Sequence, residues 1–203
     1  WFNSTGTSLY VSHVTSVFEH TLSTAWDVST ISYVTGSNFY TGNSEGNTRG
    51  FWWKPDGTKM FVVGTLNDTV YEYHFSTGFD FSTGNQSTAQ ASFSVASQAG
   101  SPRDVQFNST GTTMYITNDT GGIYEYSLST AWDVTTASYT SNVLDVSSTS
   151  ATPQAIYFGN GNLYITTDTN DAVHQYNFSS DGLVLGTGSF ASTDVGKRIQ
   201  GNG

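Results

Sequence analysis

A short sequence pattern recurs four times along the chain, and this repeat constrains the fold more than any other feature. Each copy contains an aromatic residue, a polar turn with a glycine, and a β-rich run. The copies read FNSTGTSLYVS at 2–12, WKPDGTKMFVV at 53–63, FNSTGTTMYIT at 107–117 and FGNGNLYIT at 158–166. The turn glycines Gly6, Gly57, Gly111 and Gly161 lie about 50 residues apart, a period typical of propeller blades and solenoid units.

The third repeat shows what one unit builds. Its β-rich runs at 104–107, 114–116, 123–128 and 138–146 are separated by residues that favour turns. Four antiparallel strands in about 50 residues, without helical periodicity, are the content of one propeller blade.

We therefore predict one all-β domain over residues 1–203, a β-propeller of about four four-stranded blades. The repeats occupy about 1–46, 47–99, 100–151 and 152–195, and a closing strand follows at 196–203.

The two ends of the repeat array fit each other. Repeat one starts at Trp1 without a first strand, whereas the tail KRIQGN at 197–202 matches the first-strand sequence RDVQFN at 103–108. Pairing of the terminal strands would remove exposed sheet edges. It could close a ring within one chain, or join subunits head to tail into a filament. A third alternative is that the chain, which starts at Trp1 rather than Met, is part of a longer propeller.

A loop with an aromatic residue before an Asp recurs in the first three repeats. The loops read LSTAWDVST at 22–30, FSTGFDFST at 75–83 and LSTAWDVTT at 128–136. Because the pair recurs with its scaffold, we favour a structural role over ligand binding. We expect the aromatic ring to pack on the blade and the carboxylate to accept backbone N–H bonds.

The second repeat is the best-defined unit, with Pro-Asp-Gly-Thr-Lys at 55–59, Met-Phe-Val-Val at 60–63 and Asn-Asp-x-Val-Tyr-x-Tyr at 67–73. This pattern resembles the YVTN/NHL-like β-propeller repeats of secreted and surface proteins, and is similar to repeats in fibre and other structural proteins of marine phages. The resemblance covers nearly the whole chain and weakens in the fourth repeat, where His174-Gln175 replaces Tyr-Glu. It implies scaffolding or binding more than catalysis, although a fold alone does not define a chemistry.

The composition disfavours several classes of partner. Six Lys and Arg against 16 Asp and Glu give a formal net charge of −10, which repels phosphate backbones and anionic lipid headgroups. No apolar run reaches the ~20 residues that span a bilayer, and the absence of Cys rules out disulfides. We expect no nucleic-acid partner and no membrane insertion. Low charge with abundant Ser and Thr favours an extracellular, cell-surface or virion location.

Six Asn-x-Ser/Thr sequons are candidate glycosylation sites, at Asn3, Asn67, Asn85, Asn108, Asn118 and Asn177. If they are modified, the chain is a glycoprotein. The alternative is that the Asn and Thr residues form turns, since the composition alone predicts almost as many sequons.

Basic residues recur at the start of the first strand of three units, at Arg49, Arg103 and Lys197, and Gln154 takes this position in the remaining unit. First strands are innermost in a propeller, so these side chains should converge at the mouth of the central channel. A cationic rim on an acidic protein would hold a carboxylate, a phosphate or an acidic glycan. The alternative is inheritance by duplication with a local ion pair, such as one with Asp104.

Aromatic residues near the junction of the first two repeats form a second candidate site. Sugar rings stack on exposed aromatic side chains, whereas propellers also use aromatic residues to pack blades together. The residues in question are Trp1, Tyr40, Trp52 and Trp53.

Groups for catalysis are spread by the repeat rather than paired. Glu19, Glu72 and Glu125 share one strand position, and Asp68, Asp119 and Asp171 share one turn, so each blade would hold one of each. The histidines at 13, 20, 74 and 174 have no metal-ligand spacing. We expect no catalytic residues, no cofactor and no metal.

The sequence thus favours a non-enzymatic structural or adhesive propeller of a surface appendage, filament or virion fibre, which contacts itself or other surface or virion proteins. A secreted glycan-binding propeller is the first alternative, and a carbohydrate-active enzyme is the second.

Overall fold

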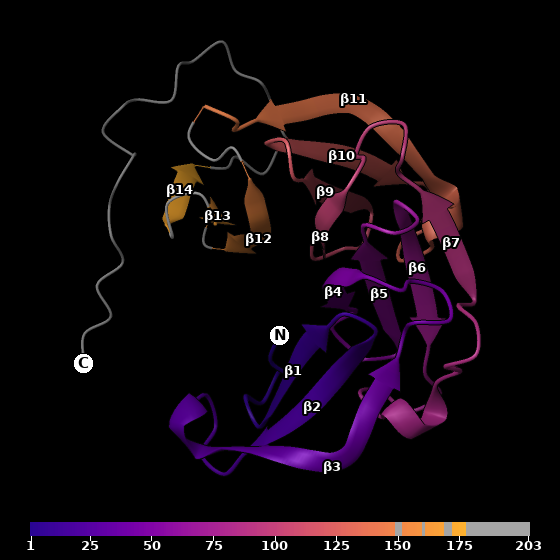
Figure 1. Ribbon diagram of the computed structural model, residues 1–203, viewed down its shortest axis with the longest axis vertical. Coiled ribbons are helices and arrows are strands. Elements are labelled where there is room, and N and C mark those ends of the chain that lie inside the picture. Colours follow the sequence, from indigo (N-terminus) through magenta and orange to yellow (C-terminus); the bar gives the residue numbers. More distant parts are fainter. Residues whose placement is uncertain (149–151, 160, 169–171, 178–203) are drawn as a thin grey trace.

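The protein folds into four antiparallel sheets arranged around a common centre, as Figure 1 shows. The computed structural model describes residues 1–148, 152–159, 161–168 and 172–177. The all-β propeller architecture predicted from the repeat is confirmed. Three short 3₁₀ helices, which the sequence patterns did not predict, lie in the aromatic–Asp loops.

Strand order within every sheet follows the sequence. The first sheet contains β1 (Ser8–His13), β2 (Ser16–Leu22) and β3 (Ile31–Tyr40). The second contains β4 (Thr48–Trp53), β5 (Lys59–Gly64), β6 (Thr69–His74) and β7 (Ala91–Ser94). The third contains β8 (Pro102–Phe107), β9 (Thr113–Asn118), β10 (Gly122–Leu128) and β11 (Ala137–Asp145). The fourth contains β12 (Pro153–Gly159), β13 (Asn162–Thr167) and β14 (Val173–Asn177). The helices are η1 (Val28–Thr30), η2 (Phe81–Thr83) and η3 (Val134–Thr136).

The core consists of three apolar layers, one between each pair of successive sheets. Strand β5 shows how one strand contributes side chains to two of these layers. Met60 and Val62 pack toward the first sheet, whereas Phe61 and Val63 pack toward the third, and all four side chains are fully buried. A strand that is covered on both faces needs a continuous apolar run, which is what the Met-Phe-Val-Val segment provides.

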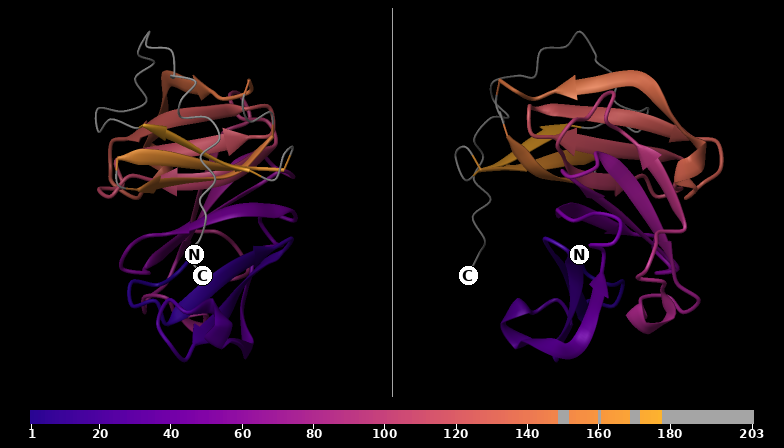
Figure 2. Two further views of the ribbon diagram at one scale, coloured as in Figure 1. Left: turned by 90° about the vertical axis from the view of Figure 1, so that its left-hand side faces the viewer. Right: turned by 45° about the vertical axis from the view of Figure 1, so that its right-hand side comes forward.

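The two middle sheets have the predicted four strands, and the outer two have three described strands each. Within the described residues, the first sheet has no complete strand before β1, and Trp1 and Phe2 lie beside β1 there. The Tyr10 N–H donates to the Trp1 carbonyl at 2.8 Å, and Phe2 forms a single bridge with Leu9. The proposed closing strand at 196–203 lies outside the described residues. Among the described residues the sheets form an open arc, as Figure 1 and the right-hand view of Figure 2 show.

The aromatic–Asp loops take the structural role predicted for them. The Trp132 N–H donates to the Gly111 carbonyl at 3.0 Å, and the indole ring lies so close to Gly111 that a Cβ atom there would be 2.1 Å from it. The Asp133 carboxylate then caps η3 by accepting the Thr135 N–H at 3.0 Å. The other two loops repeat the arrangement with Gly57, Phe79 and Asp80 and with Gly6, Trp26 and Asp27.

The second and third of these loops face the preceding sheet. Trp132 stacks on Trp52 of the second sheet, with ring centroids 5.1 Å apart and ring planes inclined by 15°. Phe79 stacks on Trp1 beside the first sheet, at 5.6 Å. No described sheet precedes the first one, and Trp26 is 59% exposed. The loops therefore join neighbouring sheets as well as the strands of one sheet.

Candidate functional site

Arg49, Arg103 and Gln154 line one cavity of about 340 Å³ near the centre of the arc. They occupy the second residue of β4, β8 and β12, which are adjacent first strands. The remaining lining residues are Ser12, His13, Val14, Asn47 and Thr48. We call this site the rim cavity. The structure brings three of the four residues singled out at this position together, and Lys197 lies outside the described residues.

Charge in the rim cavity is only partly neutralised. The Arg103 Nη2 atom lies 3.4 Å from the Asp119 carboxylate, so the local ion pair is with Asp119 and not with Asp104 as the sequence suggested. The Arg103 Nε atom is buried without a hydrogen-bond partner in the described part of the chain. Arg49 is exposed and forms no ion pair with any described residue. At least one guanidinium in the cavity is therefore available to an anion.

Asp104, one residue further along β8, serves as a link between first strands. Its carboxylate is buried and accepts the N–H groups of Val105 at 2.9 Å and of Ile156 in β12 at 3.0 Å. Gly50 makes room for it, because a Cβ atom at Gly50 would lie 2.5 Å from the Asp104 Cα. Burial raises the pKa of Asp104 to about 7, despite these hydrogen bonds. This interaction rather than an ion pair with Arg103 explains the acidic residue at this position.

His13 is a cavity residue that the sequence patterns did not reveal. It ends β1, where the second repeat has Gly64, so the repeat alignment contains no matching basic residue. It lies beside Arg49 because β1 and β4 are neighbours in space.

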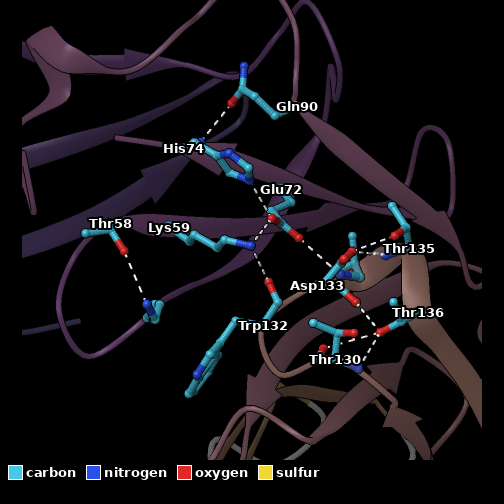
Figure 3. Close-up of polar contacts among 12 residues, drawn as sticks. Thr58, Lys59, Glu72, His74, Gln90, Thr130, Trp132, Asp133, Thr135 and Thr136 are labelled. Carbon is cyan, nitrogen blue, oxygen red and sulfur yellow. Dashed lines mark hydrogen bonds and ion pairs between the residues drawn. The ribbon is translucent and has the colours of Figure 1, made fainter. Parts of the chain in front are cut away.

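Lys59, Glu72 and His74 form a second charged cluster, between the second and third sheets (Figure 3). Glu72 Oε1 lies 2.5 Å from both Lys59 Nζ and His74 Nε2. Glu72 Oε2 accepts the Val134 N–H at 3.1 Å, and Lys59 Nζ also donates to the Trp132 carbonyl at 2.7 Å. The Glu72 side chain is only 2% exposed. This cluster, which we call the Glu72 lock, connects β5 and β6 through hydrogen bonds to the aromatic–Asp loop of the next sheet.

The Glu72 lock was not predicted, although its residues are visible in the sequence. Glu72 and His74 are two residues apart on β6 and share a face, and Lys59 is the cross-strand partner of His74. Repeat alignment compared Glu72 with Glu19 and Glu125 instead of with its spatial neighbours. Those three glutamates lie in different sheets, as predicted. Of the aligned aspartates, Asp171 lies outside the described residues.

The described sequons are mostly engaged in turns. Asn3 and Asn108 accept two backbone N–H groups each through their side-chain oxygens. Asn118 does the same and is only 4% exposed, so a glycan could not be attached without opening its turn. Asn67 and Asn85 are exposed. Asn177 ends β14. Asn85 also accepts the Ser87 N–H at 2.9 Å, so the turn-forming alternative explains four of the six sequons.

The four aromatic residues near the first junction do not form one exposed surface. Trp53 is fully buried and Trp52 is 9% exposed, so both serve packing between sheets. Trp1 is half-buried against Phe79. Only Tyr40 is well exposed, at 40%.

The described residues contain no group of three or more His, Cys, Asp and Glu side chains placed to hold a metal ion. No described helix is long and apolar enough to cross a bilayer.

Comparison with known proteins identifies the fold of the chain but assigns it to no family. No family profile and no curated protein sequence matches the chain. Among solved structures it is similar to 6-phosphogluconolactonase-like proteins of Bacteroides fragilis (TM-score 0.56, 11% identity, 87% of this chain and 49% of that one) and Bacteroides uniformis (TM-score 0.54, 12% identity, 88% and 52%). A protein of unknown function from Desulfotomaculum acetoxidans also matches (TM-score 0.51, 13% identity, 86% and 52%). The chain spans about half the length of these structures. The likeness establishes a β-propeller fold.

Removal of the Glu72 carboxylate should destabilise the protein. In Glu72→Ala the Lys59 ammonium and the Val134 N–H lose a buried partner, so we expect the free energy of unfolding to fall by about 3 kcal/mol. Asp56→Ala is the matched control, because Asp56 also binds a lysine, Lys54 at 2.7 Å, but is 51% exposed. The control should cost less than about 1 kcal/mol. Chemical denaturation measures both variants, and equal losses would contradict the assignment of the Glu72 lock.

Asp104 should make stability depend on pH in a defined direction. Its folded pKa, about 7, exceeds the usual value of 3.8, so the folded state holds the proton more tightly than the unfolded state. The resulting stabilisation is complete below pH 4 and is lost as the pH rises through 7, by up to about 1.4 kcal/mol per pH unit. Asp104→Asn should remove this component. Denaturation of both proteins from pH 4 to 8 tests it, and parallel pH profiles would contradict it.

Proposed function

We propose that the chain is a non-enzymatic β-propeller module with a structural or adhesive role in an extracellular, cell-surface or virion assembly, and that its rim cavity holds an acidic group of the partner. The observation that supports this most is the convergence of Arg49 and Arg103 in one cavity, with incomplete neutralisation by Asp119. The rest of the protein is acidic, with a net charge of −10. An isolated basic site on an acidic surface orients an anion toward that site and excludes nucleic acid elsewhere.

The size and chemistry of the rim cavity favour a carboxylate on a polymer, such as an acidic glycan. Its volume of about 340 Å³ is at the small end for ligand sites, enough for one sugar residue or one carboxylate-bearing side chain. A guanidinium can bind a carboxylate through two parallel hydrogen bonds. The amides of Asn47 and Gln154, in the same lining, can hydrogen-bond hydroxyl groups beside the carboxylate.

The acidic side chains that bind the chain's own backbone support the non-enzymatic part of the proposal. The Asp27, Asp80 and Asp133 carboxylates cap 3₁₀ helices, and Glu72 and Asp104 bind backbone N–H groups of the next sheet. Catalytic carboxylates need oxygens that are open to substrate. These groups act in folding.

The outer face of the first sheet supports the structural part. Val28 is 58% exposed, whereas the matching residues Phe81 and Val134 are buried against a preceding sheet. Trp26 is 59% exposed, whereas the matching residues Phe79 and Trp132 stack on Trp1 and Trp52. This face has the shape and chemistry to pack against another blade of the same kind, in a second copy or in a neighbouring protein.

Binding of a polyuronate such as polygalacturonate, measured by biolayer interferometry at low salt, tests the rim cavity. We expect Arg49→Ser to weaken binding about tenfold, because one charged hydrogen-bonding partner is lost, and Arg49→Ser with Arg103→Ser to abolish it. Lys54→Ser removes the same charge outside the cavity and should change affinity less than about twofold. Equal effects of Arg49→Ser and Lys54→Ser would show nonspecific attraction only and contradict the proposal, as would absence of binding.

A further inference from the structure

Two junctions between sheets have the same backbone plan but different polar groups. In the second sheet Phe61 pairs with Glu72 and Lys59 pairs with His74. In the first sheet Tyr10 pairs with Glu19 and Ser8 pairs with Thr21. Glu19 therefore occupies the place of Glu72, and Ser8 occupies the place of Lys59.

At the junction of the second and third sheets, the place beside the glutamate is filled by an ammonium group of the chain itself. Lys59 Nζ bridges Glu72 and the carbonyl of Trp132, the aromatic residue of the next loop. The same loop also contacts Glu72 directly, because the Val134 N–H donates to the Glu72 carboxylate. The junction is closed and its carboxylate is neutralised.

At the junction of the first and second sheets, the described groups that hydrogen-bond to the glutamate are neutral hydroxyl groups. Glu19 accepts the hydroxyl groups of Ser8 at 3.3 Å and Ser37 at 2.6 Å. The carbonyl of Phe79, which matches Trp132, accepts the Tyr10 hydroxyl at 3.3 Å. No Lys, Arg or His of the described residues forms an ion pair with Glu19. The half-buried carboxylate thus has no cationic partner among the described residues.

A groove of about 620 Å³ opens beside Glu19 at this junction. Phe81, which matches Val134, lines the groove, and Asp80 supplies a second carboxylate to the same wall. Other polar lining residues include Ser37, Asn38 and Gln86. The groove is lined by Glu19 and Phe79, the counterparts of Glu72 and Trp132 in the Glu72 lock, and it is large enough for a lysyl side chain with its flanking backbone.

We propose that this groove binds a primary ammonium group, carried by a lysine side chain or a small alkylamine. The ammonium would contact Glu19 and the Phe79 carbonyl, as Lys59 contacts Glu72 and the Trp132 carbonyl. A carbonyl oxygen has two lone pairs, so the bond from the Tyr10 hydroxyl leaves room for this contact. The net charge of −10 favours the approach of a cation.

Titration with butylamine, followed by the amide NMR signals of residues lining the groove, tests the proposal. We expect saturable shifts near Glu19 and Phe81, and none with tetramethylammonium, which has the same charge but no N–H donor. Glu19→Gln should weaken butylamine binding about tenfold or more, because a charged hydrogen bond is lost. An acetylated Gly-Lys-Gly peptide is the second probe: tighter binding than butylamine indicates a protein-borne lysine, and weaker binding indicates a free amine.

Ser8→Lys is the decisive variant, because it places the chain's own ammonium where Lys59 lies in the Glu72 lock. It should abolish butylamine binding and raise the midpoint of thermal unfolding. Ser92→Lys, on the exposed face of β7, adds the same charge away from the groove and should change neither. Unchanged butylamine binding in Ser8→Lys would overturn the proposal, and so would equal binding of tetramethylammonium. Because Ser8→Lys should stabilise the fold, the test does not depend on whether Glu19→Gln folds.

Discussion

The contact on which the structure depends is that of an aromatic ring with a bare glycine in the first turn of each of the first three sheets. Gly6, Gly57 and Gly111 have φ values of 70° to 72°, a left-handed conformation that favours glycine, and the missing side chain lets the ring of the aromatic–Asp loop lie directly on the turn. The aromatic residues also have φ values of 63° to 66°, which is costly for bulky side chains. The ring packing and the capping bonds of the following Asp offset this cost.

Because the aromatic–Asp loop packs on the glycine turn of its own sheet, the loop also contacts the preceding sheet. Trp132 then stacks on Trp52, and its carbonyl and the Val134 N–H reach Lys59 and Glu72. The loops thus connect the first three sheets, and the Asp104 bond to the Ile156 N–H connects the third sheet to the fourth. The starts of β4, β8 and β12 come together at the rim cavity. The same plan with Ser8 in place of Lys59 leaves a polar groove. Differences at a few equivalent positions, Ser8 for Lys59 among them, thus separate a closed junction from a candidate binding site.

Repeat analysis could predict the features that each blade shares. The period indicated the sheets, and recurrence of the aromatic–Asp pair indicated its packing role. The convergence of Arg49, Arg103 and Gln154 followed from their equivalence. The partner of Arg103 and the Glu72 lock could not be found in this way, because they join residues of different type, and in the lock Lys59 has no basic counterpart in the other repeats. The closing strand and Lys197 lie outside the described residues.

A double-mutant cycle on Gly111 and Trp132 tests the central claim most directly. In the native background Gly111→Ala introduces a Cβ atom 2.1 Å from the indole ring, at a φ of +71°, and should lower the free energy of unfolding by about 3 kcal/mol or more. In the Trp132→Ala background the steric conflict is absent, and the same change should cost only the backbone strain of about 1 kcal/mol. A coupling of about 2 kcal/mol is therefore expected. Additive losses, with no coupling between the two positions, would contradict the account.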